Sequence, residues 1–338
     1  MNGKRWAALG IAAVIFVFSI ITSLVSITAT TNMESVLEGF LGESNETFAE
    51  DIIQDGNDMQ KIAVLDVNGT IQDTGEAGSL LSASGYNHQS FMEKLNYIKE
   101  DSNVKGVIIK VNSPGGGVVE SAEIHDKIVE IEKETKKPVY ISMGSMAASG
   151  GYYISAAANK IFASPETLTG SLGVIMHGYN YKGLAEKYGV DFVTIKSGPY
   201  KDIMSPSREM TKEEKEILQT MINNSYEGFV KVIADGRGMS ESDVKKIADG
   251  RIYDGRQAKE LNLIDDFGYF NDVVEQMKKD YKLKDPQVVS YTDSTGIASI
   301  LGMSANKLKL MGEDKELTNI LKLVANTNSP RLMYLYAE

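Results

Sequence analysis

Short apolar runs alternate with amphipathic segments along most of the chain from residue 61 onward. Runs such as KIAVLDVNG, VKGVIIKVNSP, KPVYISMG and KIFASP are rich in β-branched residues and end in Gly, Pro or Asn-Gly, which predicts strands. Between them, SFMEKLNYIKED and VVESAEIHDKIVEIEKE carry apolar residues at helical spacing. Buried strands that alternate with helices favour an α/β fold with a mainly parallel sheet.

The same alternation continues to residue 293. We expect an apolar helix at 146–159, a helix at 181–189 and a strand over VDFVTIKSG at 190–198. A long amphipathic helix follows from Thr211 to Ala234, and its first residues, TKEE, form a capping box in which Thr211 caps and Glu214 reaches back. Further helical stretches precede a last predicted strand, PQVVSYTD.

The N-terminus carries a different pattern, with no charged residue from position 6 to position 33. A membrane span needs about 20 apolar residues, whereas the apolar core of a cleaved signal peptide has about 7–15. We therefore predict one transmembrane helix, a signal anchor at 6–33, with a cleaved signal peptide as the alternative. Lys4 and Arg5 precede the span, which places residues 1–5 in the cytoplasm and the rest outside the cell membrane.

These patterns divide the remainder into three parts. Residues 34–60 are interpreted as a stalk or lead-in helix, 61–295 as one extracytoplasmic domain, and 296–338 as a C-terminal helical segment and tail. The tail ends in SPRLMYLYAE, which is apolar for a chain terminus. It could seal an interface, or it could occupy a groove that accepts apolar peptides and regulate it.

Composition removes several classes of function. The net charge of −11 makes nucleic acid an unfavourable partner. The chain has no cysteine, which excludes disulfides, thiolate catalysis and cysteine-bound metal.

Two glycine-rich turns follow neighbouring predicted strands, SPGGG at 113–117 and AASGG at 147–151. The carboxyl ends of adjacent parallel strands face one crevice, so the backbone N–H groups of both turns could form an oxyanion hole around Ser149. Taken alone, SPGGG is at least as well explained by a plain tight turn, and AASGG is better explained by close packing of the helix that follows. Taken together, they point to acyl-transfer chemistry.

A serine nucleophile needs a base, and the chain has three histidines. We expect His88 to be solvated and His125 to be packed on a helix. His177 lies 28 residues after Ser149, a spacing similar to that of Clp-type proteases. Lys201 is the competing candidate, because a lysine in a turn can act as a base where desolvation lowers its pKa.

Five motifs occur together and in the same order as in a known protein family. PGGGVVES, YISMGSMAASGGYYIS, TGSLGVI, SGPYKDIMSP and GRIYDGRQAKELNLIDDFG resemble the bacterial signal peptide peptidase A family of membrane-anchored Ser/Lys proteases. The resemblance covers roughly residues 61–275 and implies a crotonase-like fold related to the Clp proteases. It implies Ser149 as the nucleophile, Lys201 as the general base, Ser171 as the hydroxyl that orients the lysine, and Gly116 and Gly150 as backbone oxyanion donors. Which of Gly115 to Gly117 donates stays open, and no metal or cofactor is implied.

The chain is about half the length of the family's long forms and has one catalytic half. We therefore expect each chain to contain its own Ser149 and Lys201 pair, within a homo-oligomeric ring. The expected activity is a serine endopeptidase that degrades remnant signal peptides at the membrane. The alternatives are a Clp-like protease that uses His177, a crotonase-type acyl-CoA enzyme, and a membrane scaffold without activity.

Overall fold

The computed structural model describes residues 48–73, 86–293 and 332–336. By its internal contacts the chain divides into two units, and the larger one comprises Glu50–Thr292 and Glu313–Glu338. Of the smaller unit, only Phe48, Ala49 and Asp293 are described. The predicted transmembrane helix at 6–33 lies outside the described residues. Within those residues, no helix is both long and apolar enough to cross a membrane.

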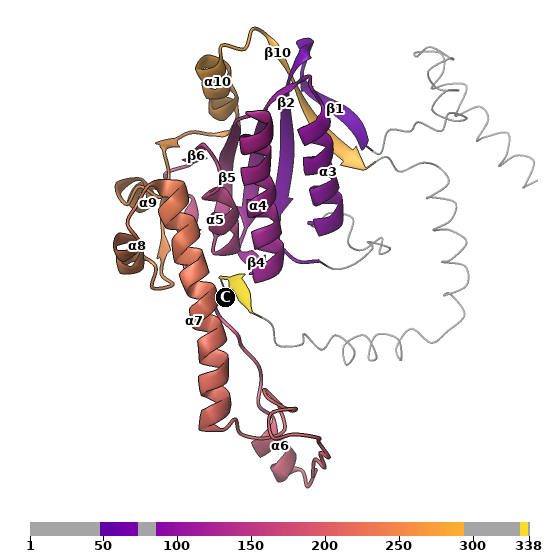
Figure 1. Ribbon diagram of the computed structural model, residues 1–338, viewed down its shortest axis with the longest axis vertical. Coiled ribbons are helices and arrows are strands. Elements are labelled where there is room, and N and C mark those ends of the chain that lie inside the picture. Colours follow the sequence, from indigo (N-terminus) through magenta and orange to yellow (C-terminus); the bar gives the residue numbers. More distant parts are fainter. Residues whose placement is uncertain (1–47, 74–85, 294–331, 337–338) are drawn as a thin grey trace, which may run out of the picture. The chain divides into compact units, whose positions relative to one another are not determined.

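The described elements alternate largely as the sequence predicts (Figure 1). In order they are β1 (Phe48–Gln54), β2 (Asn57–Asn68), α3 (His88–Glu100), β3 (Val104–Ser113), β4 (Gly115–Gly117), α4 (Val118–Thr135), β5 (Val139–Ala148), α5 (Gly150–Ser155), β6 (Lys160–Ala163), β7 (Leu168–Gly170), α6 (Lys182–Lys187), α7 (Lys212–Arg237), α8 (Glu241–Ile247), β8 (Ile252–Tyr253), α9 (Gly255–Glu260), β9 (Asp266–Phe267), α10 (Phe270–Tyr281), β10 (Pro286–Asp293) and β11 (Met333–Leu335).

The main sheet has the strand order β1-β10-β2-β3-β5-β6-β9, and β7 pairs with the second half of β5. The pairings of β10 with β2, β2 with β3, β3 with β5, β5 with β6 and β7, and β6 with β9 are all parallel. A mixed α/β fold with a mostly parallel sheet is therefore confirmed.

Helices cover the sheet because alternate residues of each buried strand point to opposite faces. On one face, α10 packs with Val273, Val274 and Met277 against a cluster of strand residues: Ile62, Val64, Ile108, Tyr140, Phe162 and Val288. On the other, α3 and α4 lie side by side (Figure 1), and their buried side chains are Phe91, Leu95, Ile98, Ile124, Ile128 and Ile131. Strands covered on both faces read as continuous apolar runs, which is what the sequence shows.

The long helix α7 begins with the predicted capping box, because Thr211 Oγ1 accepts from the Glu214 N–H and the Glu214 carboxylate accepts from the Thr211 N–H. Its buried apolar residues, Phe229, Val230, Ile233 and Ala234, all lie in its C-terminal half. The N-terminal half therefore extends away from the sheet core, and the segment 177–211 that leads into it is mostly exposed (Figure 1).

Three element predictions need correction. The segment 190–198 forms no strand. Val193 is 88% and Ile195 is 96% exposed, so its apolar side chains face solvent rather than a sheet among the described residues. The described part of the predicted stalk, residues 48–60, lies in β1, in β2 and in the two-residue turn between them. The predicted helix at 146–159 starts only at Gly150, because β5 continues to Ala148, where it pairs with β7.

Candidate active site

Ser149 lies at the sharp turn between β5 and α5. Its backbone has φ 54° and ψ −114°, a strained conformation for a residue with a side chain. Its N–H donates to the Gly170 carbonyl and its own carbonyl accepts from the Tyr153 N–H, which holds the turn at both ends. The residue is fully buried, and its Oγ has no hydrogen-bond partner among the described residues. A strained turn that presents a hydroxyl without a partner is typical of a nucleophile.

The two predicted glycine turns do meet. A Cβ on Gly115 would lie 2.6 Å from the Gly150 nitrogen, and a Cβ on Gly150 would lie 3.0 Å from the Gly116 nitrogen. The N–H groups of Gly115 and Gly117 donate elsewhere, to Ser113 Oγ and to the Ile71 carbonyl. Of the three glycines, Gly116 is the one whose backbone nitrogen lies close to Gly150 and whose N–H is not used by Ser113 or Ile71.

The chain's own C-terminal strand lies against these turns. β11 pairs antiparallel with β4, with Tyr334 opposite Gly116, and its other edge is bridged by Ile175 through two hydrogen bonds of 3.0 Å with Met333. The Tyr334 carbonyl oxygen lies 3.1 Å from where a Cβ on Gly150 would be. An extended peptide thus lies between two backbone edges, with one carbonyl directed into the space between the glycine turns.

The surroundings of the Tyr334 side chain show where a peptide in this position places one of its side chains. Its ring stacks on Tyr153 at a centroid distance of 4.8 Å and contacts Phe229 at 4.6 Å. Its hydroxyl donates to the Ser225 carbonyl at 3.0 Å, and burial raises the pKa of this phenol. The pocket is therefore aromatic along its walls and accepts one hydrogen bond at its base. The sequence patterns do not identify Tyr153 and Phe229 as residues of this pocket. The apolar C-terminal segment is the one sequence feature that indicates a peptide groove.

Ser171 is brought close to Ser149. β7 pairs with β5 so that Gly170 lies opposite Ala148, and Ser171 and Ser149 are the residues that follow. Ser171 is 8% exposed, has φ 50°, and donates its N–H to the Arg251 carbonyl at 2.7 Å. Ser149, Ser171, Gly116 and Gly150 therefore form one cluster at the carboxyl ends of the strands.

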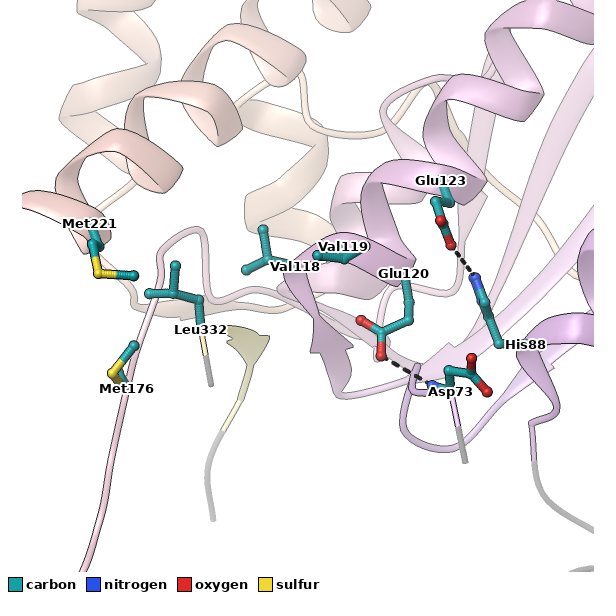
Figure 2. Close-up of a pocket in the computed structure, with 9 residues that line it drawn as sticks. All are labelled: Asp73, His88, Val118, Val119, Glu120, Glu123, Met176, Met221 and Leu332. Atoms are coloured by element: carbon teal, nitrogen blue, oxygen red, sulfur yellow. Dashed lines mark hydrogen bonds and ion pairs between the residues drawn. The ribbon is translucent and has the colours of Figure 1, made fainter. Parts of the chain in front are cut away.

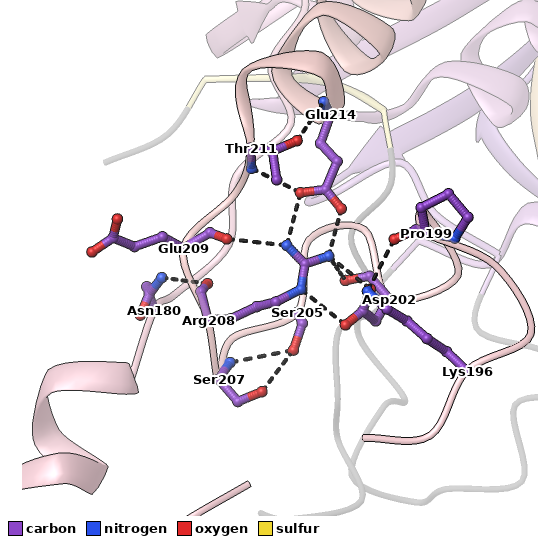
Figure 3. Close-up of polar contacts among 10 residues, drawn as sticks. All are labelled: Asn180, Lys196, Pro199, Asp202, Ser205, Ser207, Arg208, Glu209, Thr211 and Glu214. Carbon is purple, nitrogen blue, oxygen red and sulfur yellow. Dashed lines mark hydrogen bonds and ion pairs between the residues drawn. The ribbon is translucent and has the colours of Figure 1, made fainter. Parts of the chain in front are cut away.

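Lys201 does not join this cluster within one chain. It is exposed, and its neighbour Asp202 is held at the N-terminal end of α7 by Arg208, which bridges Asp202 and Glu214 (Figure 3). Phe229, by contrast, contacts Tyr153 beside Ser149. Glu214 and Phe229 are separated by about 22 Å of helix at about 1.5 Å per residue. No contact between Lys201 and Ser149 occurs among the described residues, and the expectation that each chain contains its own pair stays a prediction.

The Arg208 network fixes the segment that carries Lys201. Arg208 donates to Asp202 at 2.7 and 2.9 Å and to Glu214 Oε2 at 2.8 Å, and Lys196 donates to Asp202 at 2.6 Å (Figure 3). Hydrogen bonds from Arg208 lower the pKa of Glu214 to about 2, and the same guanidinium lowers the pKa of Asp202. Charge-assisted bidentate pairs are well-directed contacts, so this turn has a defined shape before any partner binds.

The histidines lie elsewhere. His177 is exposed and its ring contacts Tyr179, so it does not reach Ser149 Oγ. His88, expected to be solvated, is only 6% exposed and bonds to Tyr86 and Glu123. His125 packs edge-on against Tyr153, as expected of a packed histidine. No cluster of three or more metal-ligating side chains occurs in the part of the chain that the structure describes.

Comparison with known proteins assigns this arrangement to a family. The profile of peptidase family S49 matches residues 131–284, and that of Clp protease matches residues 82–169. The chain is 44% identical to a protein of Enterococcus faecium named as a candidate signal peptide peptidase, SppA, over 99% of both chains. It is 38% identical to a candidate protease of Synechocystis sp., over 78% of this chain and 90% of that protein. It is also 33% identical to protease 4 of Haemophilus influenzae, over 85% of this chain and 48% of that protein. The chain therefore belongs to peptidase family S49, the signal peptide peptidase A family, and is a serine peptidase.

Proposed function

We propose that this chain is a membrane-anchored serine endopeptidase that uses Ser149 and Lys201 to cleave apolar peptides, including the remnants of signal peptides. One observation carries the proposal: an extended segment of the chain itself lies beside the strained, buried Ser149, with a carbonyl directed between the two glycine turns. Peptide substrates bound by β-strand addition adopt this arrangement. The family name of the relatives supplies the substrate class.

The chemistry follows from the groups in the cluster. Ser149 Oγ attacks the scissile carbonyl, and the N–H groups of Gly116 and Gly150 stabilise the oxyanion. Neutral Lys201 accepts the serine proton and returns it to the leaving amine, which releases the C-terminal product and leaves an acyl-enzyme. Water, deprotonated by the same lysine, then releases the N-terminal product. Ser171, next to the nucleophile in register, orients the lysine amine.

We propose that a neighbouring copy supplies Lys201, because this lysine is exposed and makes no described contact with the buried Ser149. The segment that carries Lys201 presents apolar side chains to solvent, among them Phe192, Val193 and Ile195. A patch of this kind marks an interaction surface. A heterologous contact of this segment with the next copy's Ser149 would close into a homo-oligomeric ring in which every copy gives one lysine and receives another.

The location of the site is part of the proposal. The uncharged segment at 6–33 would anchor the chain in the cell membrane, with residues 1–5 in the cytoplasm and the catalytic domain outside. An anchor of this kind raises the effective concentration of membrane-bound peptides at the site. We also propose that the fold is crotonase-like and related to that of the Clp proteases; the match of the Clp protease profile to residues 82–169 supports this.

The decisive experiment is a pH–rate profile on an apolar, internally quenched peptide. We expect kcat/KM of the full-length protein to rise above neutral pH, because only a neutral general base can accept the serine proton, and both Ser149→Ala and Lys201→Ala to lack activity. His177→Ala serves as the matched control and should keep the wild-type profile. Near-normal turnover of Lys201→Ala together with an inactive His177→Ala would replace this assignment with a Ser/His pair.

The position of β11 also supports a role for the tail as an internal occupant of the groove. Removing residues 329–338 should raise the initial rate on short peptides, because the groove no longer has a competing strand. An unchanged rate would leave β11 as a structural strand only.

A further inference from the structure

Next to the peptide groove lies a cavity of about 530 Å³ that no catalytic step uses. Its lining divides into two kinds of residue (Figure 2). Met176, Met221 and Leu332 lie on one side, and Val118 and Val119 lie in the middle. Asp73, His88, Glu120 and Glu123 form the other side, which is called the acidic wall below.

The strand β11 gives the direction in which a peptide enters this cavity. Met333 is opposite Gly117, and the strands are antiparallel, so the chain before Met333 runs toward the first turn of α4. Leu332, the next residue back, already lines the apolar side of the cavity. Residues further toward the N-terminus of a bound peptide are therefore the ones that can reach the acidic wall.

Hydrogen bonds hold the side chains of the acidic wall in place. Glu120 is only 9% exposed, and its Oε1 accepts from the Asp73 N–H at 3.1 Å. Glu123 Oε2 bonds His88 Nε2 at 2.6 Å, and His88 Nδ1 bonds the Tyr86 hydroxyl at 2.7 Å. The described residues that line the cavity include three carboxylates and no lysine or arginine. Water screens a carboxylate in a recess less than one on an open surface, so these carboxylates attract a cation more strongly.

We propose that the acidic wall receives a lysine or arginine side chain of the substrate, one to three residues before the apolar residue that takes the position of Leu332. The proposal rests on the peptidase function proposed above and defines its substrate class further. A basic residue followed directly by apolar residues is the junction between the charged and apolar regions of a signal peptide. The chain's own sequence has the same order, with Arg331 before Leu332.

The enzyme would therefore grip a signal peptide at this junction and cut it a few residues into the apolar region. The test uses the full-length protein in detergent and internally quenched peptides with a Leu-Met-Tyr core. Arg, Gln or Glu is placed in turn at each of the three positions before Leu. We expect kcat/KM in the order Arg, Gln, Glu, with an Arg-to-Gln ratio of at least about fivefold at one position or more.

Variants and salt then locate the preference. The Arg-to-Gln ratio should fall toward one in Glu120→Gln and in Glu123→Gln, whereas Glu134→Gln, on the same helix outside the cavity, should keep it. In the wild type alone, the ratio should also fall between about 0.05 and 0.5 M salt, since screening shortens the range of the attraction. A wild-type ratio near one, or a ratio that survives both cavity variants, would overturn the proposal. Cleavage of the Gln peptides by wild type, but not by Ser149→Ala, keeps the peptidase function standing in that case; absence of any cleavage removes both.

Discussion

The proposal that a site takes its serine and its lysine from different copies leads to a quantitative prediction for mixed assemblies. If each site takes its serine from one copy and its lysine from a neighbour, Ser149→Ala and Lys201→Ala chains should complement each other. In a random equal mixture, a site works only where a Lys201→Ala copy supplies the serine and a Ser149→Ala copy supplies the lysine. About a quarter of the sites then meet this condition, so we expect about a quarter of wild-type activity from two inactive proteins.

A second mixture distinguishes sites shared between copies from sites within one chain more sharply. Wild type is combined in equal amounts with the double variant Ser149→Ala, Lys201→Ala. Sites shared between copies should again give about a quarter of wild-type activity, because both contributing copies must be wild type, whereas sites within one chain would give about half. The two expectations of about a quarter rest on the shared-site arrangement. That arrangement is supported by the roughly 22 Å of α7, at about 1.5 Å per residue, between Glu214 in the Arg208 network and Phe229, which contacts Tyr153.

The assay is hydrolysis of a quenched apolar peptide by assemblies purified through two different affinity tags, one on each variant. Size-exclusion chromatography shows that both chains are present in the same particle. Wild type mixed with Ser149→Ala should give about half of the wild-type rate under either arrangement and serves as the calibration. Mixed particles that form but have no activity, together with a half-active wild-type and double-variant mixture, would refute a site shared between copies.

Three further predictions concern stability. Burial raises the pKa of Glu132 to about 7 from 4.5, so the folded chain favours its neutral form. Ionising it costs stability as pH rises through this range; Glu132→Gln should therefore stabilise by about 1–2 kcal/mol at pH 8, after allowance for solvent screening, and by nothing below pH 4.5, in urea unfolding. Lys137 Nζ donates to three backbone carbonyls at the C-terminal end of α3, so Lys137→Met should cost about 1–3 kcal/mol, with exposed Lys133→Met as the control; an equal loss in both would contradict it. Gly115 has φ +101°, and a Cβ there would lie 2.1 Å from the Tyr334 carbonyl oxygen, so Gly115→Ala should lower Tm and activity, and an unchanged Tm would show that this turn adapts.

Much of the site was recoverable from the sequence because its parts are local. The turn around Ser149 needs only a strand, a short apolar stretch and two glycines, all within a few residues. The Thr211 capping box is likewise set by residues three positions apart, and it forms as predicted. The meeting of the two glycine turns required only that neighbouring parallel strands end at the same edge of the sheet.

Other features depend on contacts that no local pattern contains. The stretch 190–198 has the composition of a strand, but it pairs with no other segment among the described residues, so propensity alone does not make it a strand. β5 continues to Ala148 because β7 pairs with its second half, which moves the start of the helix by four residues from the predicted position. His88 is buried rather than solvated because Tyr86 and Glu123 close around it.

The sequence by itself determined the order of the elements, the parallel sheet, the serine turn and the family, because periodicity, turn chemistry and motifs are written in adjacent residues. Only the tertiary structure decided that Lys201 is exposed near the N-terminal end of α7, that the nitrogen of Gly116 lies close to Gly150, and that β11 lies along the glycine turns. Each of these depends on the direction and length of α7, or on backbone pairing between segments more than a hundred residues apart. A lysine about fifty positions after the serine can lie beside it or at the far end of a long helix, and only packing separates the two cases.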